Sequence, residues 1–182
     1  DEARRDYASW LKLWPFRDSG PCMSAYSAFS LLSALRLLRI KMQLMSANTM
    51  KVARFLSRHP RVQHVDYLGL GDHPLHGMAR RYMALVDAEE PTPTFGHLMS
   101  FTVRGTAEET RRVFDGLRRI YRATDLGRVK SVATIPAIST HQQQGDEGRR
   151  LAGILPTMIR LCVGAENPDD VIGVLEHALK KV

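Results

Sequence analysis

The residue of this sequence with the clearest chemical potential is Arg160, in the middle of the apolar run MIRLCV (158–163). The run alternates, so it predicts a strand with Arg160 on the same face as Met158 and Cys162. Apolar neighbours indicate that this face is covered, and a covered guanidinium is best satisfied by a carboxylate that accepts two hydrogen bonds. The simpler interpretation is an arginine whose stem lies on the outer face of the sheet while its charge reaches water.

A polar stretch, PAISTHQQQGDEGRR (136–150), precedes that strand and shows no periodicity. It predicts a loop, and its Ser139, Thr140 and His141 offer side chains that form hydrogen bonds. Unstructured polar loops beside a candidate site are often binding lids. These three residues are therefore candidate ligand contacts at the entrance to a site near Arg160.

Other polar residues of this sequence fit no established motif for catalysis or metal binding. Gly69 and Gly71 lack the third glycine of a phosphate loop, and His73 and His76 have no cysteine or carboxylate cluster to complete a metal site. The block Asp146-Glu147 indicates a solvated surface. Cys22 and Cys162 stand far apart, which fits a reducing compartment such as the cytoplasm. We therefore expect no metal.

The elements that must position these residues alternate between strands and helices. Strands are predicted at 62–67, 97–103, 120–124, 131–135 and 158–163, and helices at 75–83, from Thr106 with a capping box to Glu109, and from Asn167. The links between strands look too short for a parallel sheet, so the fold class is α+β with a mainly antiparallel sheet.

The first third of the chain is helical in pattern. We expect residues 1–20 to be a lead-in arm from a preceding domain, with Trp14-Pro15 breaking its helix, residues 21–60 to be a long helical connector, and residues 61–182 to be the α+β domain. Serines recur every third residue from Ser24 to Ser33, which favours a buried helix approached closely by another element. That helix should continue without a break to about Ser57.

Composition excludes several classes of protein. The chain has 182 residues, 44% hydrophobic and 25% charged, which is typical of a globular domain. It contains no apolar stretch long enough for a membrane span, so we expect no membrane partner. The net charge of +7 keeps a basic nucleic-acid-binding module open as an alternative, but no predicted strand carries the paired aromatics that stack on bases.

Several segments together resemble one family. They are Lys130-Ser131, IPAISTH (135–141), MIRLCVGAENPDDVIGVLEHAL (158–179), PCMSAYSAFSLLSALRLLRIKM (21–42), VARFLSRHPRVQHVDYLGLGDHP (52–74) and HLMSFTVRG (97–105). In order and nearly throughout the chain, they resemble the C-terminal domain of the Cys/Met-metabolism enzymes that depend on pyridoxal phosphate. That family includes cystathionine γ-synthase, O-acylhomoserine sulfhydrylases and methionine γ-lyase.

The resemblance implies the small C-terminal domain of a fold-type-I enzyme of trans-sulfuration, acting by γ-replacement or elimination on an amino-acid substrate. It implies that Arg160 binds the substrate α-carboxylate and that residues 135–144 shape the active-site entrance. Asp125 stands where family members often carry serine, which leaves its role open. Ile135 stands where a histidine is common.

The resemblance also implies pyridoxal 5'-phosphate held mainly by an N-terminal domain, and subunits that form dimers or tetramers. None of the lysines stands in the motif of the lysine that binds this cofactor, so we expect this segment alone to be inactive, with no catalytic residue of its own. The alternative is a stand-alone domain that binds an amino acid or a protein partner without catalysis.

Overall fold

The structure is a computed structural model that describes residues 6–85, 89–90 and 92–182. The chain divides into two compact units, Asp1–Arg39 and Ile40–Val182. The candidate site lies wholly within the second unit.

The first unit is helical throughout most of its described length. It begins with α1 (Tyr7–Leu11), which Asp6 caps by accepting a hydrogen bond from the Ser9 amide at 3.2 Å. The expected break at Trp14-Pro15 is wrong, because the chain continues as a π-helix, η2 (Lys12–Phe16), and then as α2 (Arg17–Ser19). A proline ring clashes with the carbonyl four residues earlier, and the wider π turn relieves that clash.

The helix that follows is shorter and more exposed than its sequence pattern predicts. Helix α3 (Ala25–Arg36) ends one residue before α4 (Leu38–Arg58), so the single long helix is interrupted at Leu37, whose amide bonds the Ala34 carbonyl. None of the α3 residues is buried, which contradicts the expected buried helix. Small residues permit close approach by another element but do not supply that element.

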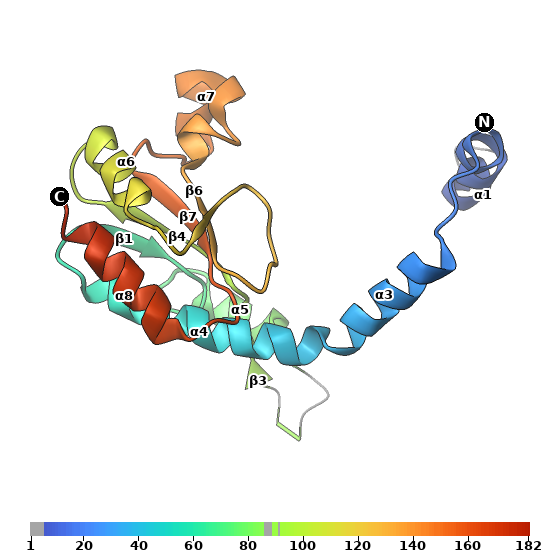
Figure 1. Cartoon of the computed structure of the whole chain (residues 1–182), viewed down its shortest axis with the longest axis horizontal. Helices are drawn as coiled ribbons and strands as arrows, with labels where there is room; N and C mark the ends of the chain where they lie inside the picture. The colour runs from blue at the N-terminus through green and yellow to red at the C-terminus, as the bar shows by residue number, and fades with distance from the viewer. Residues whose placement is uncertain (1–5, 86–88, 91) are drawn as a thin grey trace. The chain divides into compact units, whose positions relative to one another are not determined.

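The second unit is built on a mainly antiparallel sheet, as the sequence predicts (Figure 1). Its strands lie in the order β1 (Val62–Asp66), β4 (Leu98–Val103), β7 (Met158–Cys162), β6 (Val132–Thr134) and β5 (Tyr121–Arg122). All neighbours are antiparallel except β5 and β6, which are parallel. A second, two-stranded sheet of β2 (Ala84–Leu85) and β3 (Thr92–Pro93) has no counterpart in the sequence prediction.

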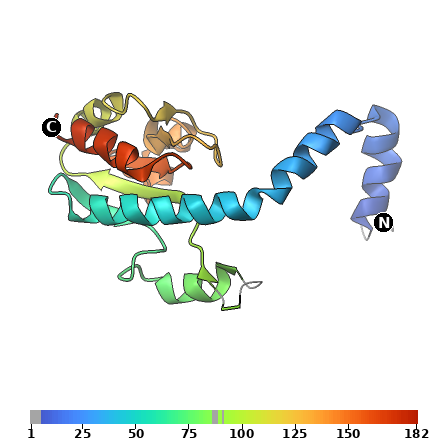
Figure 2. The ribbon, with the colours of Figure 1, turned by 60° about the horizontal axis from the view of Figure 1, so that its bottom comes forward.

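Three helices pack on one face of the larger sheet. They are α4, α6 (Ala107–Asp115) and α8 (Pro168–Leu179), and their buried side chains form one core with the sheet residues Met99, Phe101, Ile159 and Leu161. In Figures 1 and 2, α4 and α8 run beside each other. An ion pair of 2.8 Å joins Lys51 of α4 to Asp169 of α8, and Nε2 of His59, just after α4, lies 3.3 Å from Oε2 of Glu176.

The segment expected to be a loop at 136–150 is largely helical. It contains two short 3₁₀ turns, η3 (Pro136–Ile138) and η4 (Gln142–Gln144), and α7 (Gly145–Leu151). Helix α7 buries no residue, so its sequence carries no apolar periodicity that could reveal it. Ion pairs of Asp146 with Arg149 and of Glu147 with Arg150 stabilise it from its exposed surface.

One more short helix, α5 (His76–Tyr82), follows β1 at the position that the sequence predicts. Across the described ranges, none of the helices combines the length and the hydropathy needed to cross a bilayer.

Candidate functional site

Four strands bring polar residues that are distant in sequence into one row on the face of the sheet opposite the helices. Asp66 of β1 pairs with Ser100 of β4, Ser100 with Arg160 of β7, and Arg160 with Thr134 of β6. Residues paired directly across antiparallel strands point to the same face. The row therefore carries a carboxylate at one end and a guanidinium two strands away.

Arg160 occupies this face as its strand pattern predicts. Its neighbours Ile159 and Leu161 are buried in the core, while Arg160 itself is partly exposed. One terminal nitrogen, Nη2, donates a hydrogen bond of 2.7 Å to the carbonyl oxygen of Thr124. Among the residues that the structure describes, no carboxylate lies within ion-pair distance of Arg160. Its positive charge is therefore oriented and left available for a ligand.

Cys162 lies on the same face, two residues after Arg160 on β7. Burial raises the pKa of its thiol, and the nearby Arg160 charge opposes that effect. The thiol therefore stays protonated at neutral pH and is a poor nucleophile. Its side chain is buried and contributes to packing.

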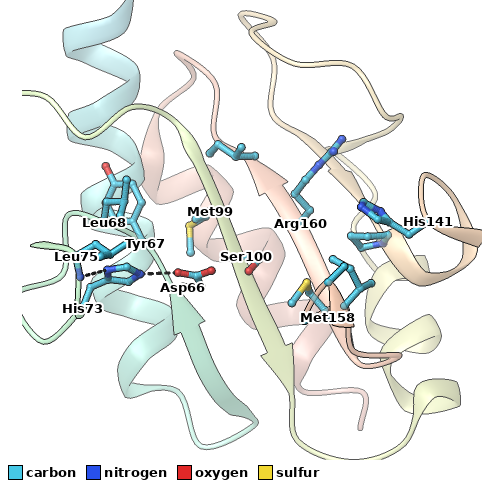
Figure 3. Close-up of a pocket in the computed structure, with 15 residues that line it drawn as sticks. Asp66, Tyr67, Leu68, His73, Leu75, Met99, Ser100, His141, Met158 and Arg160 are labelled. Carbon is cyan, nitrogen blue, oxygen red and sulfur yellow. Dashed lines mark hydrogen bonds and ion pairs between the residues drawn. The ribbon is translucent and has the colours of Figure 1, made fainter. Parts of the chain in front are cut away.

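A cavity of about 560 Å³ opens along the polar row (Figure 3). In the close-up, Asp66 and His73 lie on one side of Ser100, and Arg160 and His141 lie on the other. Apolar residues complete the wall, among them Leu75, Leu98, Pro136, Ile154 and Met158. Such a cavity suits a small molecule with an aliphatic middle and charged groups.

The three loop residues expected at the site have different positions. Ser139 does not line the cavity. Its hydroxyl instead donates to the Ile135 carbonyl and bonds Thr134 Oγ1, each at 2.8 Å. Thr140 is also outside the wall, but its hydroxyl bonds Nδ1 of His141 at 2.8 Å. Only His141 lines the cavity with Arg160. Ser139 and Thr140 are thus placed to orient their neighbours.

The segment between β5 and β6 holds the carbonyl that anchors Arg160. Asp125, the next residue after Thr124, forms an ion pair with Arg128, and its Oδ1 is buried without a hydrogen-bond partner in the described structure. Lys41 of α4 donates a 2.6 Å hydrogen bond to the Gly127 carbonyl. This segment is therefore fixed from two directions.

Lys41 also acts on a histidine just before β4. Burial, with a smaller contribution from the Lys41 charge, lowers the pKa of His97. His97 is therefore neutral at pH 7, and its Nε2 is buried without a partner among the described residues. It does not line the cavity of Arg160.

Asp66 and His73 form a pair that sequence reasoning missed. Nε2 of His73 lies 2.8 Å from Oδ1 of Asp66, and the backbone amide of Leu75 donates to Nδ1 of His73 at 3.1 Å. The local sequence shows a turn with His73 and His76, and nothing in it links His73 to Asp66. The register that sets Asp66 opposite Ser100 places Asp66 in the polar row. That register cannot be obtained without the fold, so the sequence alone does not reveal Asp66 as a site residue.

The remaining candidates from the sequence, His76 and Gly69, contribute to the packing of the turn after β1. His76 bonds the Leu68 carbonyl at 2.8 Å, and a side chain at Gly69 would collide with Tyr67 and Met50, so this turn is a packing feature. Burial raises the pKa of Tyr67, whose hydroxyl donates to the Gly96 carbonyl at 2.9 Å. Within the described ranges, no three His, Cys, Asp or Glu side chains are arranged to hold a metal ion.

The cofactor implied by the resemblance requires a lysine amine. Among the residues that the structure describes, no lysine lines the cavity. Elsewhere, Lys41, Lys51 and Lys180 are bound to Gly127, Asp169 and Glu176 respectively. Among the described residues that line the cavity, none therefore supplies the amine that this cofactor needs.

Comparison with known proteins identifies relatives of this chain. The chain is 35% identical over 166 residues to an O-acetyl-L-homoserine sulfhydrylase of Leptospira meyeri, covering 91% of this chain and 36% of the relative. A solved putative O-acetylhomoserine (thiol)-lyase of Campylobacter jejuni, described with N'-pyridoxyl-lysine-5'-monophosphate, superposes with a TM-score of 0.82 at 32% identity. That superposition covers 93% of this chain and 38% of the other.

A second structure, cystathionine γ-synthase of Xanthomonas oryzae pv. oryzae in complex with cystathionine, matches with a TM-score of 0.76 at 33% identity. It covers 89% of this chain and 40% of the other. The chain thus spans well under half the length of these relatives. The match to fold-type-I enzymes confirms the predicted fold class. The sequence model described as "Cys/Met metabolism PLP-dependent enzyme" matches residues 4–180, and the chain therefore belongs to that family, whose cofactor is pyridoxal 5'-phosphate.

Proposed function

We propose that this chain is the substrate-binding part of an enzyme of sulfur amino-acid metabolism, and that Arg160 binds the α-carboxylate of its substrate. The reaction we assign to the complete protein is γ-replacement or elimination on a homoserine ester, cystathionine or methionine. The observation that carries the proposal is the guanidinium of Arg160, which is anchored at the Thr124 carbonyl and forms no ion pair with another described residue.

Arg160 suits this role because a guanidinium binds a carboxylate through two parallel hydrogen bonds. Its bond to the Thr124 carbonyl fixes the plane of the group, so less conformational entropy is lost when the substrate binds. The cofactor supplies an electron sink when bound. The contribution of Arg160 is to hold the substrate in the orientation in which its Cα–H bond can react.

The other residues of the wall support the same class of ligand. Leu75, Leu98 and Met158 offer apolar contacts to the aliphatic and thioether atoms of a sulfur amino acid. His141 lines the cavity with Arg160, and its Nδ1 is bonded to the Thr140 hydroxyl. We assign to it a contact with the substrate.

Replacement of Arg160 tests the proposal. In the full-length protein loaded with its cofactor, Arg160→Ala should lower kcat/KM by at least about a hundredfold, equivalent to roughly 3 kcal/mol for a lost charged pair. Arg160→Lys should recover part of the loss, because it keeps the charge without the planar fork.

The matched control is Arg122→Ala, since Arg122 is exposed and paired with Asp115 outside the cavity. This variant should keep kcat/KM within about twofold. Near-normal kcat/KM in Arg160→Ala would remove the carboxylate assignment.

The absence of a lysine from the described cavity wall favours a second candidate, an amino-acid-binding domain without catalysis. A domain of this kind would bind methionine in titration calorimetry. The binding would be lost in Arg160→Ala and would not require pyridoxal phosphate. The intact mass of the native polypeptide separates the candidates. A mass well above 20.5 kDa supports the enzyme, and a mass of 20.5 kDa supports the binding domain.

A further inference from the structure

The carboxylate at the far end of the polar row has no place in the function proposed above. We propose that Asp66 is a second specificity determinant, which binds a cationic group at the distal end of the ligand that Arg160 holds by its carboxylate. Among the amino acids that Arg160 can hold, the cavity then prefers those whose side chain carries a distal ammonium group. This inference rests on the proposed function, because the position of the ligand is set by Arg160.

The protonation of His73 follows from its contacts. The backbone amide of Leu75 can only donate, so Nδ1 of His73 must be the acceptor in that hydrogen bond. Nε2 therefore carries the proton and donates it to Oδ1 of Asp66. A proton on Nδ1 would oppose the Leu75 amide, so the contacts in the structure are those of a neutral imidazole that donates to a carboxylate.

This arrangement leaves a negative charge directed at the cavity. One oxygen of Asp66 is held by His73, and in the described structure Oδ2 has no hydrogen-bond partner. The side chain is 56% exposed, while that of His73 is only 13% exposed. His73 thus fixes the orientation of a carboxylate that is still open to a ligand. A neutral partner does not cancel its charge, whereas an arginine or lysine would.

The row sets the length of the ligand. Asp66 and Arg160 lie on strands separated only by β4, and adjacent strands are about 4.8 Å apart, so their backbones are about 10 Å apart. A carboxylate and an ammonium joined by about seven bonds span roughly 8 Å when extended, since each residue of about three bonds spans 3.3–3.6 Å. The exposed side chains of Leu75 and Leu98 lie in the same wall and suit the uncharged middle of such a ligand.

A structural role for Asp66 is the alternative, in which it only holds His73 and the turn that follows β1. That role predicts a change in stability but no preference between ligands. Probes that differ only at the distal group therefore separate the two roles.

The experiment uses two thioethers of homocysteine, S-(2-aminoethyl)homocysteine and S-propylhomocysteine. They have the same length and differ only in a terminal ammonium or methyl group. Binding is measured by titration calorimetry on the full-length protein. The unmodified protein should bind the ammonium probe about three- to tenfold more tightly, and the preference should fall between about 0.05 M and about 0.5 M salt.

Asp66→Asn should remove this preference and leave the affinity for the propyl probe within about twofold, because asparagine can still accept the hydrogen bond of His73. Asp115→Asn, an exposed acid paired with Arg122 away from the cavity, is the control and should keep the preference. Arg160→Ala should weaken both probes equally.

The outcomes are distinct. Equal binding of the two probes by the unmodified protein overturns the inference even if Asp66→Asn does not fold. A preference that persists in Asp66→Asn overturns it as well. If Arg160→Ala leaves both affinities unchanged, the proposed function fails instead. A lost preference in Asp66→Asn with both affinities weakened in Arg160→Ala supports both.

Discussion

Gly164, just after β7, has no space for a side chain. A Cβ there would collide with the carbonyl oxygen of Val129 and the carboxylate of Glu166. Its amide donates to Ser131 Oγ at 3.0 Å and its carbonyl accepts from Asn48 Nδ2 at 3.1 Å. Glu166 in turn accepts from the amide and hydroxyl of Ser131, at 2.8 and 2.9 Å. One backbone position therefore joins α4, β6 and the end of β7.

Gly164→Ala should destabilise the protein by about 1–3 kcal/mol, because the groups that a methyl would meet include backbone atoms that cannot move aside. The measurement is chemical unfolding of the full-length protein. Gly173→Ala is the matched control, since it lies exposed in α8 with nothing within 4 Å of the added Cβ. It should be neutral or stabilising by up to about 1 kcal/mol. Equal effects of the two substitutions would refute the steric argument.

Sequence reasoning could find some site residues and not others. Arg160 could be predicted because a charged residue in an alternating apolar run is recognisable from only six residues. The structure confirms that its side chain lies on the face of β7 opposite Ile159 and Leu161. Asp66 and Ser100 carry no such local signal, because their importance comes from pairing with each other and with Arg160. Hydrogen bonds within the loop, such as that of Ser139 to Thr134, are also invisible in the sequence.

At the scale of single elements, α6 shows a local signal that the structure confirms completely. Thr106 Oγ1 accepts from the Glu109 amide at 3.2 Å, and the Glu109 carboxylate accepts from the Thr106 amide at 2.7 Å. The bonds from the Thr106 amide and hydroxyl lower the pKa of Glu109 below its ordinary value. The charged form is therefore the one that the folded helix favours.

The pH dependence follows from that direction. A carboxyl with a lowered pKa in the folded state stabilises the fold above its unfolded pKa, near 4.3, and this contribution is lost as pH falls through the folded pKa. Glu109→Gln should lower Tm at pH 7, and the difference from the unmodified protein should shrink below about pH 4. Glu108→Gln, in the same first turn but outside the capping box, is the control. A Tm difference for Glu109→Gln that is the same at neutral and acidic pH would contradict the assignment.

The connection between β5 and β6 shows where element-level rules fall short. Parallel strands are usually joined by a crossover of about a dozen residues or more, so the short links predict antiparallel pairs. Residues 123–131 nevertheless join a parallel pair. This is possible because β5 has only two residues, Tyr121 and Arg122, and the chain needs little length to return.

At the scale of the whole molecule, burial is distributed unevenly along the chain. The helices α1, η2, α2 and α3 bury none of their residues, and their exposed side chains include Trp14, Tyr26 and Phe29. The larger sheet, by contrast, is covered by a continuous apolar core. Apolar surface of this extent normally has a partner in a folded protein.

Hydrogen exchange should report this difference. In the 182-residue polypeptide, amides of α3 should exchange orders of magnitude faster than those of β4 and β7, because local opening of an unburied helix costs little. In the full-length protein the α3 amides should become protected if the remaining part of the protein covers them. Protection of α3 equal to that of β7 in the 182-residue polypeptide would refute this expectation.

The fold class could be predicted because strand alternation and helix caps are local, and the sheet order confirms the mainly antiparallel arrangement. The exposure of α3 could not be predicted. The serine spacing describes the surface of α3 itself, whereas burial also requires a second element that packs against that surface. The break at Leu37 likewise has no glycine or proline to mark it.

The polar row has one more consequence, which concerns a divided chain. A cut in the exposed turn around Arg118 and Arg119 would leave Asp66 and Ser100 on one fragment and Thr134 and Arg160 on the other. Neither fragment alone would carry both charges, and only correct reassembly of β4 against β7 would restore them to one cavity. Ligand binding would then report that β4 and β7 had paired in the correct register. The divided sheet would thus act as a split sensor that is read out by ligand binding.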